Sequence, residues 1–239
     1  MGYAITSNRI GSSELKENAL KGLASARSFI LSQKGILYMD LLKQSAIAWK
    51  EITEYCYLLT YGYKKKLYPI NLTFSPEDYP HLAGFQYMKD ISLPNYTSSK
   101  IVERILEGKI TFDKVQEAAQ YEKMIKPRLE ALIHLKNSLD NEFLLYSYMP
   151  RMYPFITGIK ADYLISSHIE INSFVFIVQA TPQGDSKCDF LCCSAFAKGD
   201  RDYEANQRSR ALLKKERLHI NSNTTTVLLD KLTPKNNES

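Results

Sequence analysis

The chain is organised around one stretch, Ser75-Pro-Glu-Asp-Tyr-Pro-His-Leu-Ala-Gly-Phe-Gln-Tyr-Met-Lys-Asp-Ile91. The stretch begins like a helix, because Ser75 can act as an N-cap and Pro76 suits the first helical position. A second proline, Pro80, removes a helical hydrogen bond, so a helix that starts at Pro80 is the alternative. Apolar residues then recur at helical spacing and predict a face directed toward a core: Leu82, Phe85 and Met88.

His81 and Gly84 lie beside these apolar positions. An imidazole can exchange a proton near neutral pH, and a glycine lets another backbone or a ligand come close. A lone histidine on a helix is more often structural, so the residue type alone leaves both roles open.

The composition fits one large globular domain, or one domain with a helical extension. The chain has 239 residues, of which 44% are hydrophobic and 24% charged, and these are ordinary values for a soluble globular protein. A net charge of +5 is mild and does not by itself imply nucleic acid. Four cysteines without C-x-x-C spacing are expected to be small buried residues in a reducing compartment.

Neither a signal peptide nor an apolar run of transmembrane length is evident in the sequence. We therefore expect a cytoplasmic protein that does not enter a membrane.

Helical and strand patterns follow one another along the chain. Helical spacing predicts a pair of helices over 14–33 and 37–50, and further helices over 98–107, 111–124 and 128–139. Residues rich in β-branched and aromatic side chains predict a β-hairpin over 51–61 and 65–74. Further strands are expected over 142–148, 159–166, 173–181, 189–197 and 225–232, and the run 202–220 stays ambiguous between helix and loop plus strand. Consecutive strands joined by short turns imply an antiparallel sheet, so the class is α+β.

Several familiar chemistries lack their motifs. The sequence contains neither the phosphate-binding Gly-x-x-x-x-Gly-Lys nor Gly-x-Gly-x-x-Gly or Gly-x-Ser-x-Gly. Its four histidines are not spaced as metal ligands. We expect no metal site and no cofactor.

The remaining polar residues suit the cleavage of RNA without a metal ion. That reaction needs a base for the 2′-hydroxyl proton, an acid for the leaving 5′-oxygen, and cations for the charge on the phosphorane. His81 is the candidate acid or base. Positive charge could come from Lys89, Arg208, Arg210, Lys214 and Lys215, and hydrogen bonds to phosphate or ribose from Tyr203, Ser194 and Gln207. The simpler alternative is that the basic run is only a solvated face.

Short motifs are spread from about Glu51 to Ile220. In chain order they are Asn71–Phe74, His81-Leu82, Gly84, Lys89-Asp90-Ile91, Ile105–Thr111, Ala161–Leu164, Phe174–Val178, Ser194–Phe196, Tyr203, Asn206-Gln207 and Leu213–Lys215. In this order they resemble a phage-associated branch of the Barnase–EndoU–colicin–RelE-like nuclease superfamily.

The resemblance implies an α+β fold in which helices pack on a small antiparallel sheet, here preceded by the N-terminal helical pair. It implies RNA cleavage without metal, with His81 as a site residue and with Ser194, Tyr203 and Lys214 as further catalytic candidates. One departure matters, because the family pattern expects a second histidine near the position of Gln86. Glutamine cannot carry protons, so activity could be weak, altered or lost.

We therefore expect an N-terminal helical extension over 1–50, a nuclease-like domain over 51–232 and a disordered tail over 233–239. The favoured function is that of a metal-independent endoribonuclease, toxin-like or related to phage or defence, whose basic strip over 208–215 binds RNA. An antitoxin or immunity protein is a candidate partner. The alternatives are an inactive RNA- or protein-binding module on the same fold, and an interaction protein that forms homo-oligomers through residues 14–50.

Overall fold

The computed structural model describes residues 40–180 and 189–234. The chain divides into two compact units, Met1–Asp40 and Leu41–Ser239, and the second contains the described elements. The helix predicted over 14–33 lies outside the described residues, and so do most of the predicted extension and of the predicted tail. The domain division expected from the sequence and the oligomer interface therefore stay predictions.

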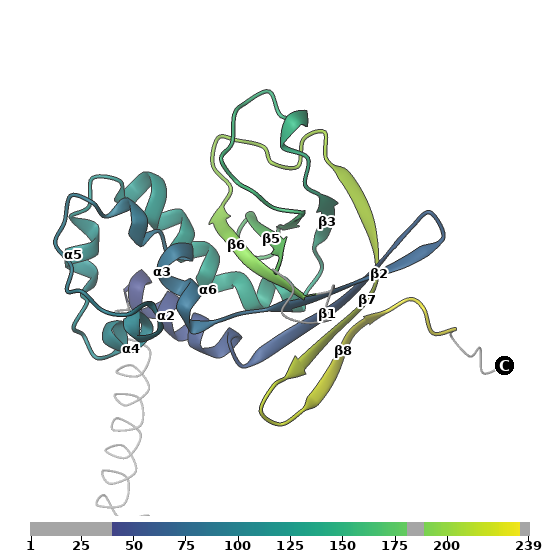
Figure 1. The fold of residues 1–239 in the computed structure, drawn as a ribbon, viewed down its shortest axis with the longest axis horizontal. Coiled ribbons are helices and arrows are strands. Elements are labelled where there is room, and N and C mark those ends of the chain that lie inside the picture. The colour runs from purple at the N-terminus through teal and green to yellow at the C-terminus, as the bar shows by residue number, and fades with distance from the viewer. Residues whose placement is uncertain (1–39, 181–188, 235–239) are drawn as a thin grey trace, which may run out of the picture. The chain divides into compact units, whose positions relative to one another are not determined.

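The second unit contains both helices and strands (Figure 1). Its α-helices are α2 (Leu41–Ile52), α3 (Tyr79–Leu82), α4 (Ile101–Leu106), α5 (Phe112–Gln116) and α6 (Lys126–Asp140). Its strands are β1 (Tyr55–Tyr63), β2 (Lys66–Thr73), β3 (Leu144–Ser147), β4 (Tyr163–Ser167), β5 (Ser173–Gln179), β6 (Asp189–Ala197), β7 (Arg208–His219) and β8 (Thr224–Asp230). None of the described helices is both long and apolar enough to cross a membrane.

The strands form a closed ring. Their order is β1-β2-β6-β5-β4-β3-β7-β8, and a further pairing of β1 with β7 closes the first seven into a barrel. Strand β8 pairs with β7 outside the ring, and β2 with β6 is a parallel pair, whereas the other pairs are antiparallel. The predicted α+β fold with a small antiparallel sheet and packed helices is therefore wrong.

Strand β7 explains why the sheet closes. The run 202–220, which the sequence left ambiguous, forms a strand over Arg208–His219. One edge of β7 pairs with β1, while the other edge pairs first with β3 and then with β8. A ring protects backbone groups that an open sheet would leave unpaired at its edges.

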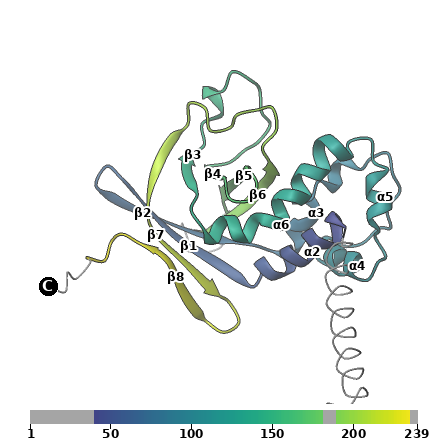
Figure 2. The same ribbon diagram turned by 180° about the vertical axis from the view of Figure 1, so that it is seen from behind.

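The main core fills the interior of the barrel and continues among the helices. Alternate residues of β1 point inward, so Tyr57, Leu59 and Tyr61 are buried. Helix α6 packs against α2 and β6, as both views show (Figure 2). Trp49 of α2 is buried and donates a hydrogen bond from Nε1 to the carbonyl oxygen of Ser75, 3.2 Å away. This bond ties the start of the 75–91 stretch to the helical part of the core.

A second, smaller cluster lies on the opposite face of β4 and β5. Leu164, Phe174 and Phe176 alternate along these strands with residues of the main core. Aromatic side chains from outside these strands pack on them, including Tyr153 and Tyr203. The hydroxyl of Tyr153 donates to the carbonyl oxygen of Tyr203 at 2.7 Å.

The stretch 75–91 folds as three short helical segments instead of one helix. Ser75 caps the first, a 3₁₀ turn over Pro76–Asp78, with the reciprocal bonds of a capping box. Helix α3 follows, and Gly84 then adopts a left-handed conformation with φ of +89°, which ends the helical path before the 3₁₀ turn Phe85–Tyr87. The predicted apolar face is still directed inward, because Leu82 and Met88 are buried and Phe85 packs on the core.

Candidate active site

Helix α3 places His81 against a bulge in strand β6. The exposed imidazole lies with Nε2 3.2 Å from the carbonyl oxygen of Cys193. The pairing of β5 with β6 shifts register between Phe176 and Ile177, so that Cys193 has no partner residue on β5. Bulges often lie next to active sites, because they redirect backbone groups and side chains. The bulge here gives the candidate histidine a carbonyl to contact.

Arg128 of α6 approaches the next residue of the same strand. Its Nη1 donates to the hydroxyl of Ser194 at 3.1 Å and to the carbonyl oxygen of Ala195 at 3.4 Å. The guanidinium also lies 5.4 Å from the ring centroids of Tyr87 and Phe196, and Nη2 is 3.5 Å from the hydroxyl of Tyr87. His81 and Arg128 therefore contact successive residues of β6, whose Cα atoms are about 3.8 Å apart.

The charge of Arg128 has neutral partners. The residue is only 8% exposed, and within residues 40–180 and 189–234 no carboxylate forms an ion pair with it. A buried charge without a counter-charge costs free energy, and an anionic ligand would relieve that cost. Arg128 therefore gives this junction a positive potential that would favour an anionic group.

Gly84 lets the chain pass close to Arg128. A Cβ atom at this position would lie 3.0 Å from Cδ of Arg128 and 3.3 Å from the carbonyl oxygen of Met124. Met124 belongs to a π-helical turn, Tyr121–Ile125, which directly precedes α6. π-Helical turns frequently occur at functional sites, and this one helps to place the arginine beside β6.

Replacing Gly84 with alanine is expected to shift Arg128 and to lower any activity of this site by roughly tenfold or more, because a small misplacement of a positioned group slows catalysis. It should also lower the free energy of unfolding by about 2 kcal/mol, because alanine resists the left-handed conformation and Arg128 must move. Gly108 provides the matched control, since its φ is +73° and a Cβ atom there would meet nothing within 4 Å. Gly108→Ala should therefore lose about 1 kcal/mol of stability and keep its activity. Equal activity of the two variants in a cleavage assay would contradict a role for the Gly84–Arg128 contact.

Two of the predicted hydrogen-bonding residues lie elsewhere. Tyr203 is buried in the second cluster, where its ring is 5.4 Å from that of Phe196, and Phe196 in turn contacts Arg128. Gln207 binds a backbone segment, because its Oε1 accepts from the amide of Met149 at 2.7 Å and its Nε2 donates to the Met149 carbonyl oxygen at 3.2 Å. Of the predicted catalytic residues, His81 contacts Cys193, the residue directly before Ser194, while the Ser194 hydroxyl itself binds Arg128.

The predicted basic strip does not form one surface. Arg208 is exposed at the start of β7, whereas Arg210 donates from Nε to the hydroxyl of Ser147 at 2.8 Å. Lys214 forms an ion pair with Glu216 at 2.9 Å, which raises the pKa of Lys214. Lys89 is exposed just after the 3₁₀ turn Phe85–Tyr87, close in sequence to His81.

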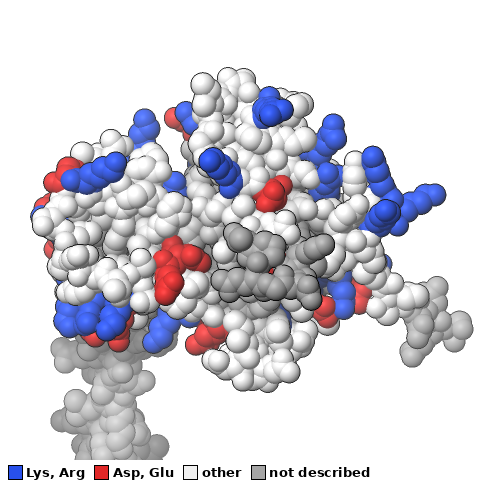
Figure 3. Space-filling view, in the orientation of Figure 1, with Lys and Arg blue, Asp and Glu red and all other residues white. Residues whose placement is uncertain are grey.

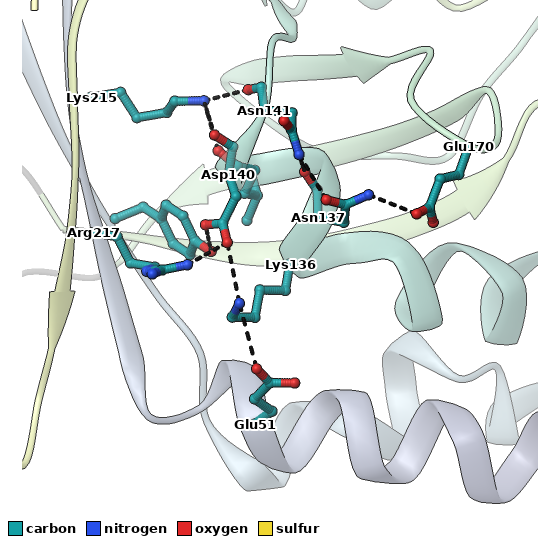
Figure 4. A network of polar contacts seen from close by, with 10 residues as sticks. Glu51, Lys136, Asn137, Asp140, Asn141, Glu170, Lys215 and Arg217 are labelled. Carbon is teal, nitrogen blue, oxygen red and sulfur yellow. Dashed lines mark hydrogen bonds and ion pairs between the residues drawn. The ribbon is translucent and has the colours of Figure 1, made fainter. Parts of the chain in front are cut away.

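Lys215 points into the protein and closes the end of α6 (Figure 4). It is 3% exposed, and its Nζ donates to the carbonyl oxygens of Leu139 at 2.8 Å, Asp140 at 3.2 Å and Asn141. These carbonyls have no partner within the helix, so the lysine satisfies them. Burial lowers the pKa of Lys215 to about 8.

The Asp140 carboxylate lies beside this cap and joins β1, β7 and α6. It accepts from the hydroxyl of Tyr57 at 2.7 Å, and it forms ion pairs with Arg217 and, at 3.2 Å, with Lys136. Burial first, and then the bond to Asp140, raise the pKa of Tyr57. This network holds the barrel to α6 and is separate from the His81 junction.

Gln86 occupies the place where a second histidine was expected. It lies in the 3₁₀ turn Phe85–Tyr87, and its buried Oε1 has no hydrogen-bond partner among the residues that the structure describes. The amide cannot replace a histidine in proton transfer. Within the described part of the chain, no group of three or more histidine, cysteine, aspartate and glutamate side chains could hold a metal ion.

Sequence reasoning missed Arg128 and Tyr87. A signal for Arg128 was present, because it shares the buried face of α6 with Leu132 and Leu135 at helical spacing. A charged residue on an apolar face calls for an explanation. Tyr87 carried no comparable signal, since its contact with Arg128 depends on the left-handed turn at Gly84.

Comparison with known proteins places the chain in a family of nucleases. The model of a family described as phage-Barnase-EndoU-ColicinE5/D-RelE like nuclease4 matches residues 41–232. This match confirms the resemblance inferred from the sequence motifs. The curated proteins gave no match, and neither did the solved structures.

Proposed function

Because the chain belongs to the phage-Barnase-EndoU-ColicinE5/D-RelE like nuclease4 family, we propose that it is an endoribonuclease that cleaves RNA without a metal ion. The observation that carries this proposal is that the exposed imidazole of His81 and the buried guanidinium of Arg128 contact successive residues of β6, Cys193 and Ser194. An imidazole can act as a general base or acid, and a guanidinium can stabilise negative charge on a phosphorane.

In the proposed reaction, His81 takes the proton of a 2′-hydroxyl group. The 2′-oxygen then attacks the adjacent phosphorus, and the bond from phosphorus to the 5′-oxygen breaks. Arg128 stabilises the charge that develops on the phosphorane, while Ser194 and Tyr87 fix the orientation of the guanidinium. The leaving oxygen takes its proton from solvent, because Gln86 cannot donate one as a histidine would. We expect slow turnover for this reason.

A toxin-like or defence-related role belongs to the same proposal. An antitoxin or immunity protein that covers His81 would be its natural partner, and the cytoplasm its compartment. A family name that joins phage proteins with colicin and RelE-like nucleases supports this role.

The test is incubation of the purified protein with total RNA and transfer RNA in EDTA, with the His81→Ala variant alongside. We expect cleavage that survives EDTA and falls about a hundredfold in the variant, the lower end for acid–base catalysis because the imidazole is exposed. Cleavage that EDTA abolishes would refute the metal-independent mechanism. Undiminished cleavage by the variant would remove His81 from the site.

A second candidate function is an inactive nucleic-acid-binding module on the same fold. Gln86 favours it, because the position lacks the group that would donate the second proton. In that case neither protein should cleave RNA at any pH, and His81→Ala should leave the affinity for RNA nearly unchanged.

A further inference from the structure

Basic side chains gather at the tip of the β1–β2 hairpin. Lys64, Lys65 and Lys66 are exposed there, and neither 61–68 nor 208–215 contains an acidic residue. Gly62 pairs with Ala211, so the start of β7, with Arg208 and Arg210, lies beside the tip. Figure 3 shows lysine and arginine side chains over the hairpin tip and the adjoining end of β7.

The turn carries its lysines in an unfavourable backbone conformation. Tyr63 pairs with Lys66, which leaves a two-residue turn in which Lys64 has φ of +48° and Lys65 has φ of +61°. Such a turn favours Asn-Gly, because residues with a bulky side chain resist positive φ. Lysine at these two positions therefore lowers the stability of the fold, and it places two positive charges on the surface. Strain of this kind points to function when it is observed together with a surface feature.

Tyr63 and Arg210 hold the patch together. The guanidinium of Arg210 lies 4.0 Å from the centroid of the Tyr63 ring, and Nζ of Lys64 lies 5.3 Å from it. The hydrogen bond with Arg210 and the charge of Lys64 lower the pKa of Tyr63. An aromatic ring between cations is typical of surfaces that bind nucleic acid, where bases stack and phosphates pair with charge.

We infer that this hairpin patch, formed by Lys64, Lys65, Lys66, Arg208 and Arg210, binds the phosphate backbone of a nucleic acid. The patch is separate from the His81 junction. Strand β2 begins at the tip and ends just before the stretch that contains His81, and its eight residues span about 25 Å. The inference rests on the proposed function, since an RNA molecule bound at the hairpin patch could extend along the surface to His81.

The test uses a double variant, Lys64→Asn with Lys65→Gly, which installs the favoured turn and removes two charges. We expect its Tm to rise by roughly 4 °C, because the strain is relieved. Its affinity for an oligodeoxythymidine of about twenty nucleotides should fall roughly ten- to thirtyfold at 0.1 M salt. The slope of log K against log salt should become shallower by about 1.4, or 0.7 for each lost phosphate contact. A DNA probe has no 2′-hydroxyl group, so the proposed reaction cannot consume it.

The matched control is Lys100→Gln with Lys123→Gln, which removes the same charge from two exposed lysines outside the patch. This control should bind the probe like the native protein. An unchanged affinity of the hairpin variant, or equal losses in both variants, would overturn the inference. So would binding to phosphatidylserine vesicles without binding to the oligonucleotide.

RNA cleavage assayed in parallel tests the proposed function independently. Patch-dependent binding without any cleavage would refute the nuclease proposal and leave the hairpin patch standing. RNA cleavage combined with binding that does not depend on the patch would support the nuclease proposal and refute the role of the hairpin patch.

Discussion

Arg128→Met is expected to lower RNA cleavage by about three orders of magnitude while leaving the protein at least as stable as the native form. An arginine that stabilises phosphoryl-transfer charge contributes about 10³- to 10⁵-fold to rate, and one oxyanion-hole donor about 10²- to 10³-fold. Stability should not fall, because methionine fills a similar volume. The change also removes a buried charge that has only neutral partners among the described residues.

Cleavage rates and urea unfolding curves of the same preparation would check both parts. Arg128→Lys tests whether cleavage needs only the positive charge or also the planar guanidinium, since lysine keeps the charge and loses the planar set of donors. We expect it to recover only part of the activity. Arg104→Met serves as the control, because Arg104 pairs with Glu107 on the surface of α4 and should not affect cleavage. If Arg128→Met unfolded the protein and the remaining folded fraction cleaved normally, the arginine would be structural.

Lys215 is expected to make stability depend on pH between about 8 and 10.5. Its pKa is about 8 in the folded protein and 10.5 as the reference value for an unfolded chain. In this window the unfolded chain binds more protons at this site than the folded chain, so stability rises with pH. Relative to Lys215→Met, which has no titrating group here, the native protein should gain about 3 kcal/mol across the window.

The measurement is the free energy of unfolding of both proteins at several pH values from 7 to 11. Tyrosines and cysteines also titrate in this range, but they are common to both proteins and cancel in the difference. A difference that stayed flat, or that fell as pH rose, would show that the three carbonyl groups at the end of α6 keep the ammonium form of Lys215 charged. Lys214→Met offers a control, because this lysine is paired at the surface.

Local patterns predicted most of the elements and failed on their assembly. The hairpin of β1 and β2 is confirmed, and strands form near each predicted position after residue 141 within the described chain. Alternation of side chains shows that a segment is a strand, yet it does not show which strand edges pair. Closure of the barrel depends on β7, whose two edges pair with three other strands. The composition of this segment left its secondary structure ambiguous.

For the candidate site too, the sequence predicted individual residues but not how the fold arranges them. His81 was predicted from its position beside an apolar helical stripe and Ser194 from its hydroxyl group, and the family resemblance then implied both as catalytic candidates. The structure places His81 of α3 against Cys193 of β6, the neighbour of Ser194, and Arg128 against Ser194 itself. The predicted strip over 208–215 was interpreted as a surface because of its charge, but adjacent residues of a strand point to opposite faces. Lys214 is therefore directed outward and Lys215 inward. Arg128 was overlooked because its burial follows from tertiary packing.

The parallel seam between β2 and β6 is short, with three aligned pairs and one side-chain bond from Asn71 to Asp189, 118 positions away. Loop-closure entropy opposes the pairing of such distant segments before their contacts stabilise it, so we expect contacts of this kind to form late in folding. His81 follows β2, and Cys193 and Ser194 belong to β6. A chain still on the ribosome, or one whose ring has not yet closed, therefore holds the two halves of the candidate site apart. We therefore expect the candidate site to be completed only late in the folding of the chain.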